Sequence, residues 1–423
     1  MGIAYLPGLV EKTENPYKDN RKMKRYCKKV DVTDRNLIQK AVFKCLKKKY
    51  KRKDALIMFS EYTGLSATFI KGLFDEFGIE ALKLMEETVV DGIREEIIHN
   101  NIHFKPMWYK EKIDASSQKV RIIGIQNIKQ QIYDYIAVEA MTDFFRRIGE
   151  YQCASMKDRG QSYGIKAIKR WMRNKSIRYA GQCDVSKCYP SIDRGKLMGF
   201  LRKYIKNDRL LDLVEKLIMT FDAGLSIGSY LSQYLCNAFL SQIYHDVAER
   251  MSRCRKKRTG IVEMVNLVKH QLFFMDDILI LGTNAKDIHN AMKMITEKAH
   301  EMGLKIKDSW MVFTTIKKRK DDGHFIDIMG VRIYRHHVTI RKRVFLRVRR
   351  SYKKALALIK QRKRIPIWLA RKCTSYKGIL DHTNSQNIER RYQTDKTIKK
   401  CKGVISNESK VRHKAKGSYC CAA

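Results

Sequence analysis

Apolar and polar positions alternate at helical spacing through most of the first hundred residues. In the stretches 66–74 and 79–98, apolar side chains recur every three or four positions, and the second stretch has the acidic residues Glu86, Glu87 and Asp91 between them. The pattern predicts a helical N-terminal extension over residues 1–104 that packs on a larger body. Helix packing accounts for these positions, so we assign no chemistry to them.

After Pro106 the pattern becomes mixed. Helical spacing predicts helices, and short apolar runs predict strands buried on both faces. The predicted helices cover 127–147, 162–174 and a segment capped by Asn284, and the predicted strands cover 119–124, 177–184, 271–274 and 278–281. Strands and helices do not alternate regularly. The predicted fold class is therefore α+β rather than a doubly wound sheet.

Two adjacent carboxylates, Asp276 and Asp277, stand between the last two of these strands. An isolated Asp-Asp pair usually marks a turn, because Asp bonds nearby backbone and tolerates unusual dihedral angles. At the rim of a buried sheet, however, two like charges repel each other and lose water, and a divalent cation relieves that cost. Asp184 ends the predicted strand 177–184. If that strand lies beside the hairpin, the three carboxylates share one sheet edge and can bind two Mg²⁺ ions.

Composition points to a polyanionic partner. The 423 residues are 44% hydrophobic, which is enough for real cores, but 87 Lys and Arg face 44 Asp and Glu, a formal net charge of +43. An excess of this size is best explained by nucleic acid. Residues 341–423 carry 25 of the basic and only 4 of the acidic residues. We therefore expect this region to lie along a phosphate backbone.

The cysteine, histidine and hydropathy patterns bear on disulfide bonds, metal binding and the cellular compartment. The 11 Cys include no Cys-x-x-Cys pair, so reduced, mostly buried thiols are expected rather than disulfides or a zinc ribbon. His336 and His337 are interpreted as surface or nucleic-acid contacts. No signal-peptide pattern opens the chain, and no segment approaches the length of a membrane span. The expectation is a cytoplasmic protein without a membrane partner.

Taken in order, the motifs resemble those of bacterial reverse transcriptases, including group II intron-like, diversity-generating retroelement and defence-associated groups. Residues 274–277 match the aromatic-x-Asp-Asp box, with Phe where Tyr is usual, and residues 184–193 match the first palm box. The resemblance extends from about Lys105 to Gly378. It implies a right-hand polymerase fold: fingers over 105–180, a palm with an antiparallel sheet over 181–340, interleaved with fingers and helical segments, and a basic helical thumb and tail over 341–423.

The resemblance also implies roles for individual residues. Asp184, Asp276 and Asp277 would be the catalytic carboxylates and the ligands of two Mg²⁺ ions, for which Mn²⁺ can substitute, whereas Asp193 would be structural. Tyr189 would exclude a ribose 2′-hydroxyl and so favour deoxynucleotides. The full set implied to bind the dNTP is Lys119, Arg121, Tyr189, Gly228 and Gln233.

Two further segments complete the resemblance. Residues 326–334 resemble the primer-grip hairpin, where Gly330 permits close approach of the backbone. The basic segment that follows would track an RNA:DNA hybrid through phosphate contacts without reading sequence. Its implied nucleic-acid contacts are Arg341, Lys342, Arg343, Arg347, Arg349, Arg350, Lys353 and Lys354.

Two departures from the family pattern affect the prediction. Ile227 stands where many relatives carry Gln. An Ile at this position resembles the enzymes of the diversity-generating and defence-associated groups, and it favours reduced fidelity. Trp310 stands where the family often has Lys. Lys305 and Lys307 are then candidates to protonate the leaving pyrophosphate, although a solvated strand edge is the simpler interpretation of both. Ser232 and Gln233 are expected to begin a helix.

The leading prediction is an RNA-directed DNA polymerase that makes cDNA from an associated, dedicated RNA in antiphage defence, because the helical extension exceeds what a minimal retroelement enzyme needs. The alternatives are a diversity-generating retroelement enzyme, a template-independent DNA polymerase and a non-catalytic RNA-binding scaffold. The intact set of three Asp argues against the scaffold. The template RNA, the primer, the fate of the cDNA and the oligomeric state do not follow from the sequence.

Overall fold

The computed structural model describes residues 24–113, 120–316 and 324–418 of the chain. Its N-terminal part is helical, as predicted. Asp34 and Ser66 cap two of these helices by accepting hydrogen bonds from backbone N–H groups in the first turn. The helices are α1 (Arg35–Leu46), α2 (Lys53–Thr63), α3 (Ala67–Glu76) and α4 (Ile79–Ile98). Their buried faces join the same hydrophobic core as the centre of the molecule.

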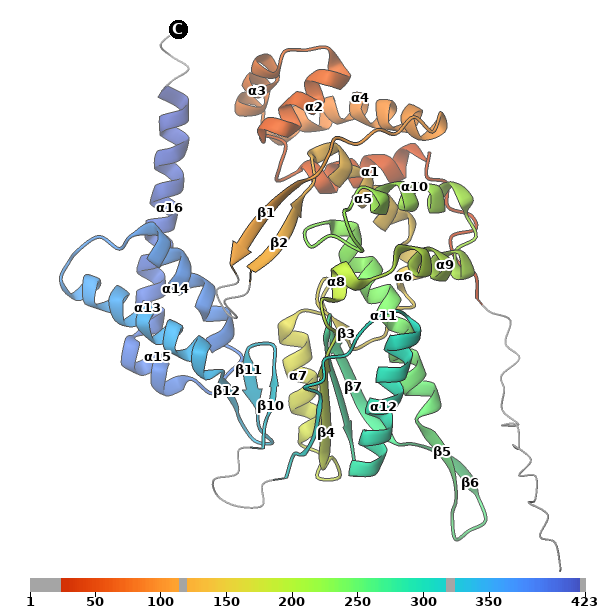
Figure 1. The fold of residues 1–423 in the computed structure, drawn as a ribbon. Helices are drawn as coiled ribbons and strands as arrows, with labels where there is room; N and C mark the ends of the chain where they lie inside the picture. Colours follow the sequence, from red (N-terminus) through yellow and green to blue (C-terminus); the bar gives the residue numbers. More distant parts are fainter. Residues whose placement is uncertain (1–23, 114–119, 317–323, 419–423) are drawn as a thin grey trace, which may run out of the picture.

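A five-stranded sheet forms the centre of the molecule (Figure 1), in the order β3-β7-β8-β4-β9. Strand β3 runs parallel to β7, and the other neighbours pair antiparallel. The strands are β3 (Gln152–Cys153), β4 (Tyr179–Asp184), β7 (Val268–Phe274), β8 (Asp277–Gly282) and β9 (Met311–Thr314). Both faces are covered, which explains the near-continuous apolar runs in the sequence.

The two faces of this sheet belong to different cores. Ile278 and Ile280 of β8 pack in one core with residues of α11 (Tyr230–Arg250) and α12 (Ala285–Glu301). Leu279 and Leu281 point to the other face and pack with α7 (Gln161–Met172). As predicted, Asn284 caps α12 by accepting from the Lys286 N–H.

Between these elements, several helix boundaries differ from those predicted from the sequence. The predicted helix 127–147 is interrupted at Met141, and Tyr189 lies in a short helix that the sequence pattern did not predict. The elements are the ribbon β1 (Trp108–Ile113) and β2 (Val120–Ile125), the helices α5 (Ile128–Ala140), α6 (Thr142–Phe145), α8 (Cys188–Ser191), α9 (Arg194–Tyr204) and α10 (Asp208–Met219), and the hairpin β5 (Ser252–Lys256) and β6 (Val262–Asn266). The predicted start of a helix at Ser232 is wrong, because Ser229 caps α11 and the helix begins at Tyr230.

The C-terminal part forms a helical unit with its own core, which includes Val348, Tyr352 and Leu369. A three-stranded antiparallel sheet joins it to the centre of the molecule (Figure 1). Met329 and Gly330, both at positive φ, make the tight turn of its first hairpin. The elements are β10 (Ile326–Ile328), β11 (Val331–Ile333), β12 (Val338–Ile340), α13 (Lys342–Lys360), α14 (Ile367–Leu380), α15 (Gln386–Tyr392) and α16 (Thr394–Ser418).

The mixed α+β class is therefore confirmed. The cysteines within the described ranges are free, and all except Cys254 are buried. None of the helices in the described part of the chain combines the length and the apolar character that crossing a bilayer requires.

Candidate active site

Strand register brings the three predicted carboxylates to one edge of the five-stranded sheet. Asp184, the last residue of β4, pairs directly with Asp277, the first residue of the antiparallel strand β8. Asp276 precedes it in the tight turn from β7, and its carbonyl accepts from the Val185 N–H at 2.9 Å. The shared sheet edge expected from the sequence is thus present, although the two motifs lie far apart in the chain.

The turn that carries Asp276 is unusual in its backbone. Phe274 and Asp277 are paired, so Met275 and Asp276 alone connect the strands. Met275 has a φ of 56°, a region that non-glycine side chains enter at a cost. Its side chain is buried, with 9% exposed, in the same core as Phe273 and Ile278. Packing of Met275 therefore holds the turn in a conformation that its own backbone disfavours.

Lys307 lies beside these carboxylates and forms an ion pair with Asp184 through its Nζ. Backbone contacts set its position, because the Lys307 N–H donates to the Asp184 carbonyl at 2.9 Å and Val185 bridges to Ile306. The sequence named Lys307 only as one of two candidate lysines. The other, Lys305, pairs instead with the exposed Asp308.

Burial and mutual repulsion raise the pKa values of Asp276 and Asp277. Burial, followed by the hydrogen bond and the charge of Asp184, raises the pKa of Asp277 to about 8. Burial and Asp184 likewise raise the pKa of Asp276, while the positive charges of Lys307 and Arg121 oppose that rise. The edge therefore holds more negative charge than its surroundings neutralise. An added cation would be stabilised there.

The donor set suits a hard divalent cation, because carboxylate oxygens are the ligands that Mg²⁺ takes in proteins. Within the described ranges, however, no three His, Cys, Asp or Glu side chains are gathered as a ready-made metal site. Asp184 faces Lys307 instead. A cation held by all three carboxylates would compete with Lys307 for the charge of Asp184.

The structure describes four of the five residues predicted to bind the dNTP. Arg121 lies on β2 within electrostatic reach of Asp276, whereas Lys119 lies outside the described residues. Tyr189 is half-buried beside the site, and burial, together with the nearby Cys236, Cys188 and Asp276, raises its pKa. Gln233 is partly buried in the first turn of α11.

Gly228 lies close to the backbone of Gly124 in β2. Its φ is +124°, and an added Cβ would lie 2.5 Å from the Gly124 carbonyl oxygen of β2. The neighbouring Ile227 carbonyl accepts from the Gly124 N–H at 3.1 Å. The segment before α11 is thus attached to the ribbon that carries Arg121.

Asp134 of α5 is a site residue that the sequence did not reveal. It is fully buried, and its Oδ2 accepts from the Ser229 hydroxyl at 2.7 Å and from the Leu231 N–H at 3.3 Å. It therefore holds the start of α11, next to Gly228. In the sequence it is one acidic residue in an amphipathic helix, so nothing distinguishes it from a surface residue.

The implied thumb contacts lie on or beside α13. Arg341 pairs with Asp327 of β10 at 2.7 Å, and the Lys354 ammonium lies 5.1 Å from the centre of the Trp368 ring. Lys342, Arg343, Arg349, Arg350 and Lys353 are exposed. Asp193 caps α9 by accepting from the Lys196 N–H, which is a structural role.

Asp184 and Asp277 lie on adjacent antiparallel strands, Asp276 lies in the adjoining turn, and Lys307 and Arg121 lie nearby. A family model for reverse transcriptase (RNA-dependent DNA polymerase) matches residues 109–339. This match spans more than half of the chain and includes all three carboxylates. The chain belongs to the reverse transcriptase family, and it is an RNA-directed DNA polymerase.

A search of solved structures found matches to two telomerases. Apo telomerase from Candida tropicalis, truncated from its C-terminal domain, is 11% identical with a TM-score of 0.40, over 77% of this chain and 85% of that one. Telomerase from Candida albicans, in complex with the TWJ fragment of telomeric RNA, gives the same identity and TM-score over 77% and 60% of the two chains. A search of the curated proteins found no match.

Proposed function

We propose that this enzyme copies a dedicated, associated RNA into cDNA, with Asp184, Asp276 and Asp277 holding two Mg²⁺ ions. The observation that carries the proposal is the register of β4 and β8, which sets Asp184 opposite Asp277 with Asp276 in the adjoining turn. Such ions, when bound, activate a primer 3′-hydroxyl and neutralise the charge on the leaving pyrophosphate.

The surrounding residues divide the remaining tasks. Arg121, on the ribbon near Asp276, offers a cation to the incoming triphosphate. Tyr189, packed beside the carboxylates, limits space at the sugar and favours dNTPs over ribonucleotides. Lys307 adjoins Asp184 and is positioned to neutralise or protonate a leaving group once it releases that carboxylate.

We assign the larger units by the same proposal. Residues 1–104 are an N-terminal extension, 105–180 fingers, 181–340 palm with interleaved segments, and 341–423 thumb and tail. The exposed basic residues of α13 support contact with the phosphates of an RNA:DNA hybrid. The buried free thiols support a reducing compartment, the cytoplasm.

The test is primer extension with purified protein, its co-purified RNA, dNTPs and Mg²⁺. The double variant Asp276→Ala, Asp277→Ala is expected to lose about 10³-fold or more in rate, because the ligands of both ions are removed. It should still bind RNA. Asp308→Ala is the matched control, since Asp308 is 90% exposed and forms its ion pair with Lys305, and its rate should equal that of wild type.

Different failures of this experiment identify different functions. Product that persists when RNA is omitted would indicate template-independent synthesis. No product from wild type, with RNA still bound, would indicate a scaffold.

For the biological role we propose antiphage defence, supported by the N-terminal helices, which share the central core. Cells that carry wild type should then form fewer phage plaques than cells that carry the double variant. Equal plaque counts, with sequence changes written into a neighbouring target gene, would indicate a diversity-generating retroelement instead.

A further inference from the structure

Helix α7 presents a basic surface that the proposed catalytic role does not use. Residues 160–183 contain six Lys or Arg and no Asp or Glu. The apolar side of α7, with Ile165 and Ile168, is buried on the five-stranded sheet. Its exposed residues include Lys166, Arg170 and Arg173. This surface is therefore positive throughout, with no carboxylate from the same segment to neutralise it.

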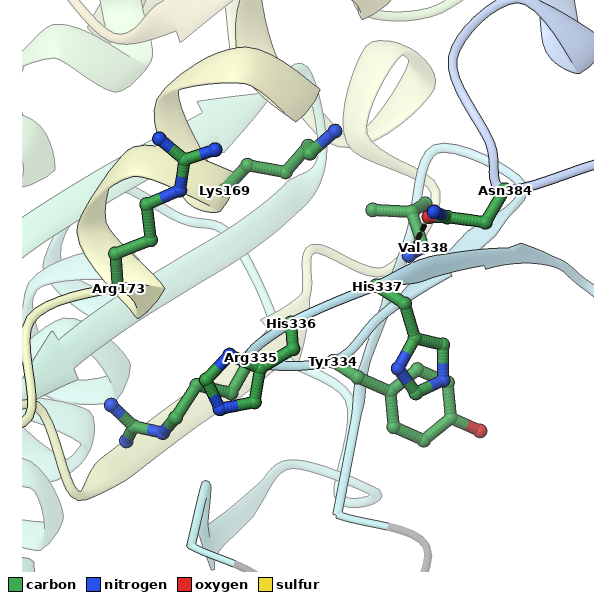
Figure 2. Close-up of a pocket in the computed structure, with 8 residues that line it drawn as sticks. All are labelled: Lys169, Arg173, Tyr334, Arg335, His336, His337, Val338 and Asn384. Atoms are coloured by element: carbon green, nitrogen blue, oxygen red, sulfur yellow. Dashed lines mark hydrogen bonds between the residues drawn. The ribbon is translucent and has the colours of Figure 1, made fainter.

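A cavity of about 410 Å³ lies at the C-terminal end of α7. Figure 2 shows Lys169 and Arg173 on the helix and the loop between β11 and β12, residues 334–337, across from them. Asn384, from the C-terminal helical unit, borders the same cavity. Among the residues that the structure describes, no acidic side chain lines it. It is thus a cationic cavity formed where three parts of the chain meet.

Arg335 builds the cavity rather than filling it. Its guanidinium donates to the carbonyl oxygens of Met172 at 2.9 Å, Asn174 at 3.0 Å and Ile177 at 2.6 Å. These bonds fasten the loop to the end of α7. The bond to Met172 also offsets the partial negative charge at the C-terminus of α7, which would otherwise repel an anion.

A second set of bonds fixes the opposite side. The Val338 N–H donates to Asn384 Oδ1 at 2.8 Å, and the Asn384 N–H donates to the Val338 carbonyl at 2.8 Å (Figure 2). The loop is therefore held at both ends before any ligand binds. By contrast, the side chains of Lys169 and Arg173 make no hydrogen bond or ion pair with any residue that the structure describes.

An aromatic pair stands next to these cations. The rings of Tyr334 and His337 stack with centroids 4.3 Å apart and an interplanar angle of 11° (Figure 2). His336 and His337 are exposed. A flat ring face beside free cations suits a nucleotide, whose base can stack while its phosphate meets Lys or Arg.

The cavity is separate from the candidate active site. Arg335 bonds to Ile177, just before β4 begins at Tyr179, whereas Asp184 ends that strand. The length of a six-residue strand is about 17 Å. A nucleotide held by Asp184 therefore does not reach this cavity.

We propose that this cavity and the basic face of α7 bind the phosphate backbone of an RNA strand outside the active site. The strand would be a second segment of the associated RNA, anchored where the sheet meets the C-terminal helical unit. RNA fits better than an acidic peptide, because the stacked rings provide a surface for a base. The inference concerns RNA binding and does not depend on catalysis.

The test compares the affinity of the full chain for a labelled single-stranded RNA in the absence of dNTPs and Mg²⁺. Lys169→Ala, Arg173→Ala should weaken binding about tenfold and lower the slope of log affinity against log salt by about 1.4, the value for two lost phosphate contacts. The control, Lys48→Ala, Lys71→Ala, removes two exposed charges from the N-terminal helices and should change neither.

Three further measurements make the result specific. His337→Ala should abolish ultraviolet cross-links between RNA and the peptide containing Tyr334. Extension of a short primer–template should be unchanged in the Lys169, Arg173 variant, since that substrate occupies only the active site. Unfolding curves should match wild type, because neither side chain has a partner to lose.

Several outcomes would overturn the proposal. Unchanged RNA affinity and salt slope in the variant would do so, as would cross-links that map elsewhere. If inorganic phosphate or a free nucleoside triphosphate at millimolar concentration bound the cavity while RNA did not, the ligand would be a small phosphate compound. If the variant lost an acidic peptide but kept RNA, the partner would be a protein.

Discussion

At the residue scale, Lys307 is the cation that the folded chain itself brings to its carboxylate cluster. It pairs with Asp184 while Asp276 and Asp277 remain partly buried nearby. A divalent ion and Lys307 therefore compete for the same negative charge. The contribution of Lys307 to the free energy of unfolding should therefore depend on whether the ion is bound.

We expect Lys307→Met to lower the free energy of unfolding in EDTA by about 1 kcal/mol, because both partners of this pair are more than a third exposed and such pairs contribute little. Mg²⁺ should then raise the melting temperature of the variant more than that of wild type. The control is Lys305→Met, whose partner is the exposed Asp308 rather than a carboxylate of the cluster. An equal Mg²⁺ effect in all three proteins would contradict the competition.

Asp134 predicts a pH dependence of stability. Burial raises its pKa from 3.8 to about 6, even though the Ser229 hydroxyl and the Leu231 N–H oppose that rise. The folded chain thus holds this proton more tightly than the unfolded chain. Its contribution to stability is present below about pH 4 and is lost as the pH rises to about 6, a difference of about 3 kcal/mol.

The variant Asp134→Asn can still accept both hydrogen bonds but has no proton to lose. Denaturant unfolding between pH 4 and pH 7 should therefore show a smaller fall in stability for the variant than for wild type. Parallel curves for the two proteins would show that Asp134 does not titrate in this range.

At the element scale, the connection between the β1–β2 ribbon and the start of α11 sets the geometry around the site. It consists of the Gly124 N–H bond to Ile227 and the close contact of Gly228 with the Gly124 carbonyl. Arg121 lies on the same ribbon. Any change that separates these segments should also move Arg121 relative to Asp276.

Gly228→Ala should cost about 2–4 kcal/mol in unfolding free energy, because it combines a strained φ with a Cβ forced against backbone. It should also raise the KM for dNTPs. The control Gly199→Ala lies within α9 with nothing within 4 Å, so it should be neutral or stabilising by about 0.5–1 kcal/mol through helix propensity. Equal stability of the two variants would rule out the contact as a constraint.

At the scale of the whole molecule, the hydrophobic cores divide the chain into separate units, but the basic surface extends across more than one of them. The N-terminal helices share the central core, whereas the C-terminal helices form their own around Tyr352. The basic surface is not confined to that C-terminal unit, since α7 carries another part of it. The basic surface therefore extends from the C-terminal unit onto the neighbouring helix of the central part of the molecule.

The sequence by itself determined the α+β class, the helical extension and the three carboxylates, because each depends on local periodicity or on a motif whose strands are continuous in the chain. Asp184 at a strand end and Asp277 at a strand start are examples: antiparallel pairing of buried strands leaves little freedom of register. Only the tertiary structure decided which lysine meets Asp184, that Asp134 holds the start of α11, and that Lys169 and Arg173 border a cavity with Tyr334. These contacts join segments distant in the chain through single side chains, and no local pattern records them.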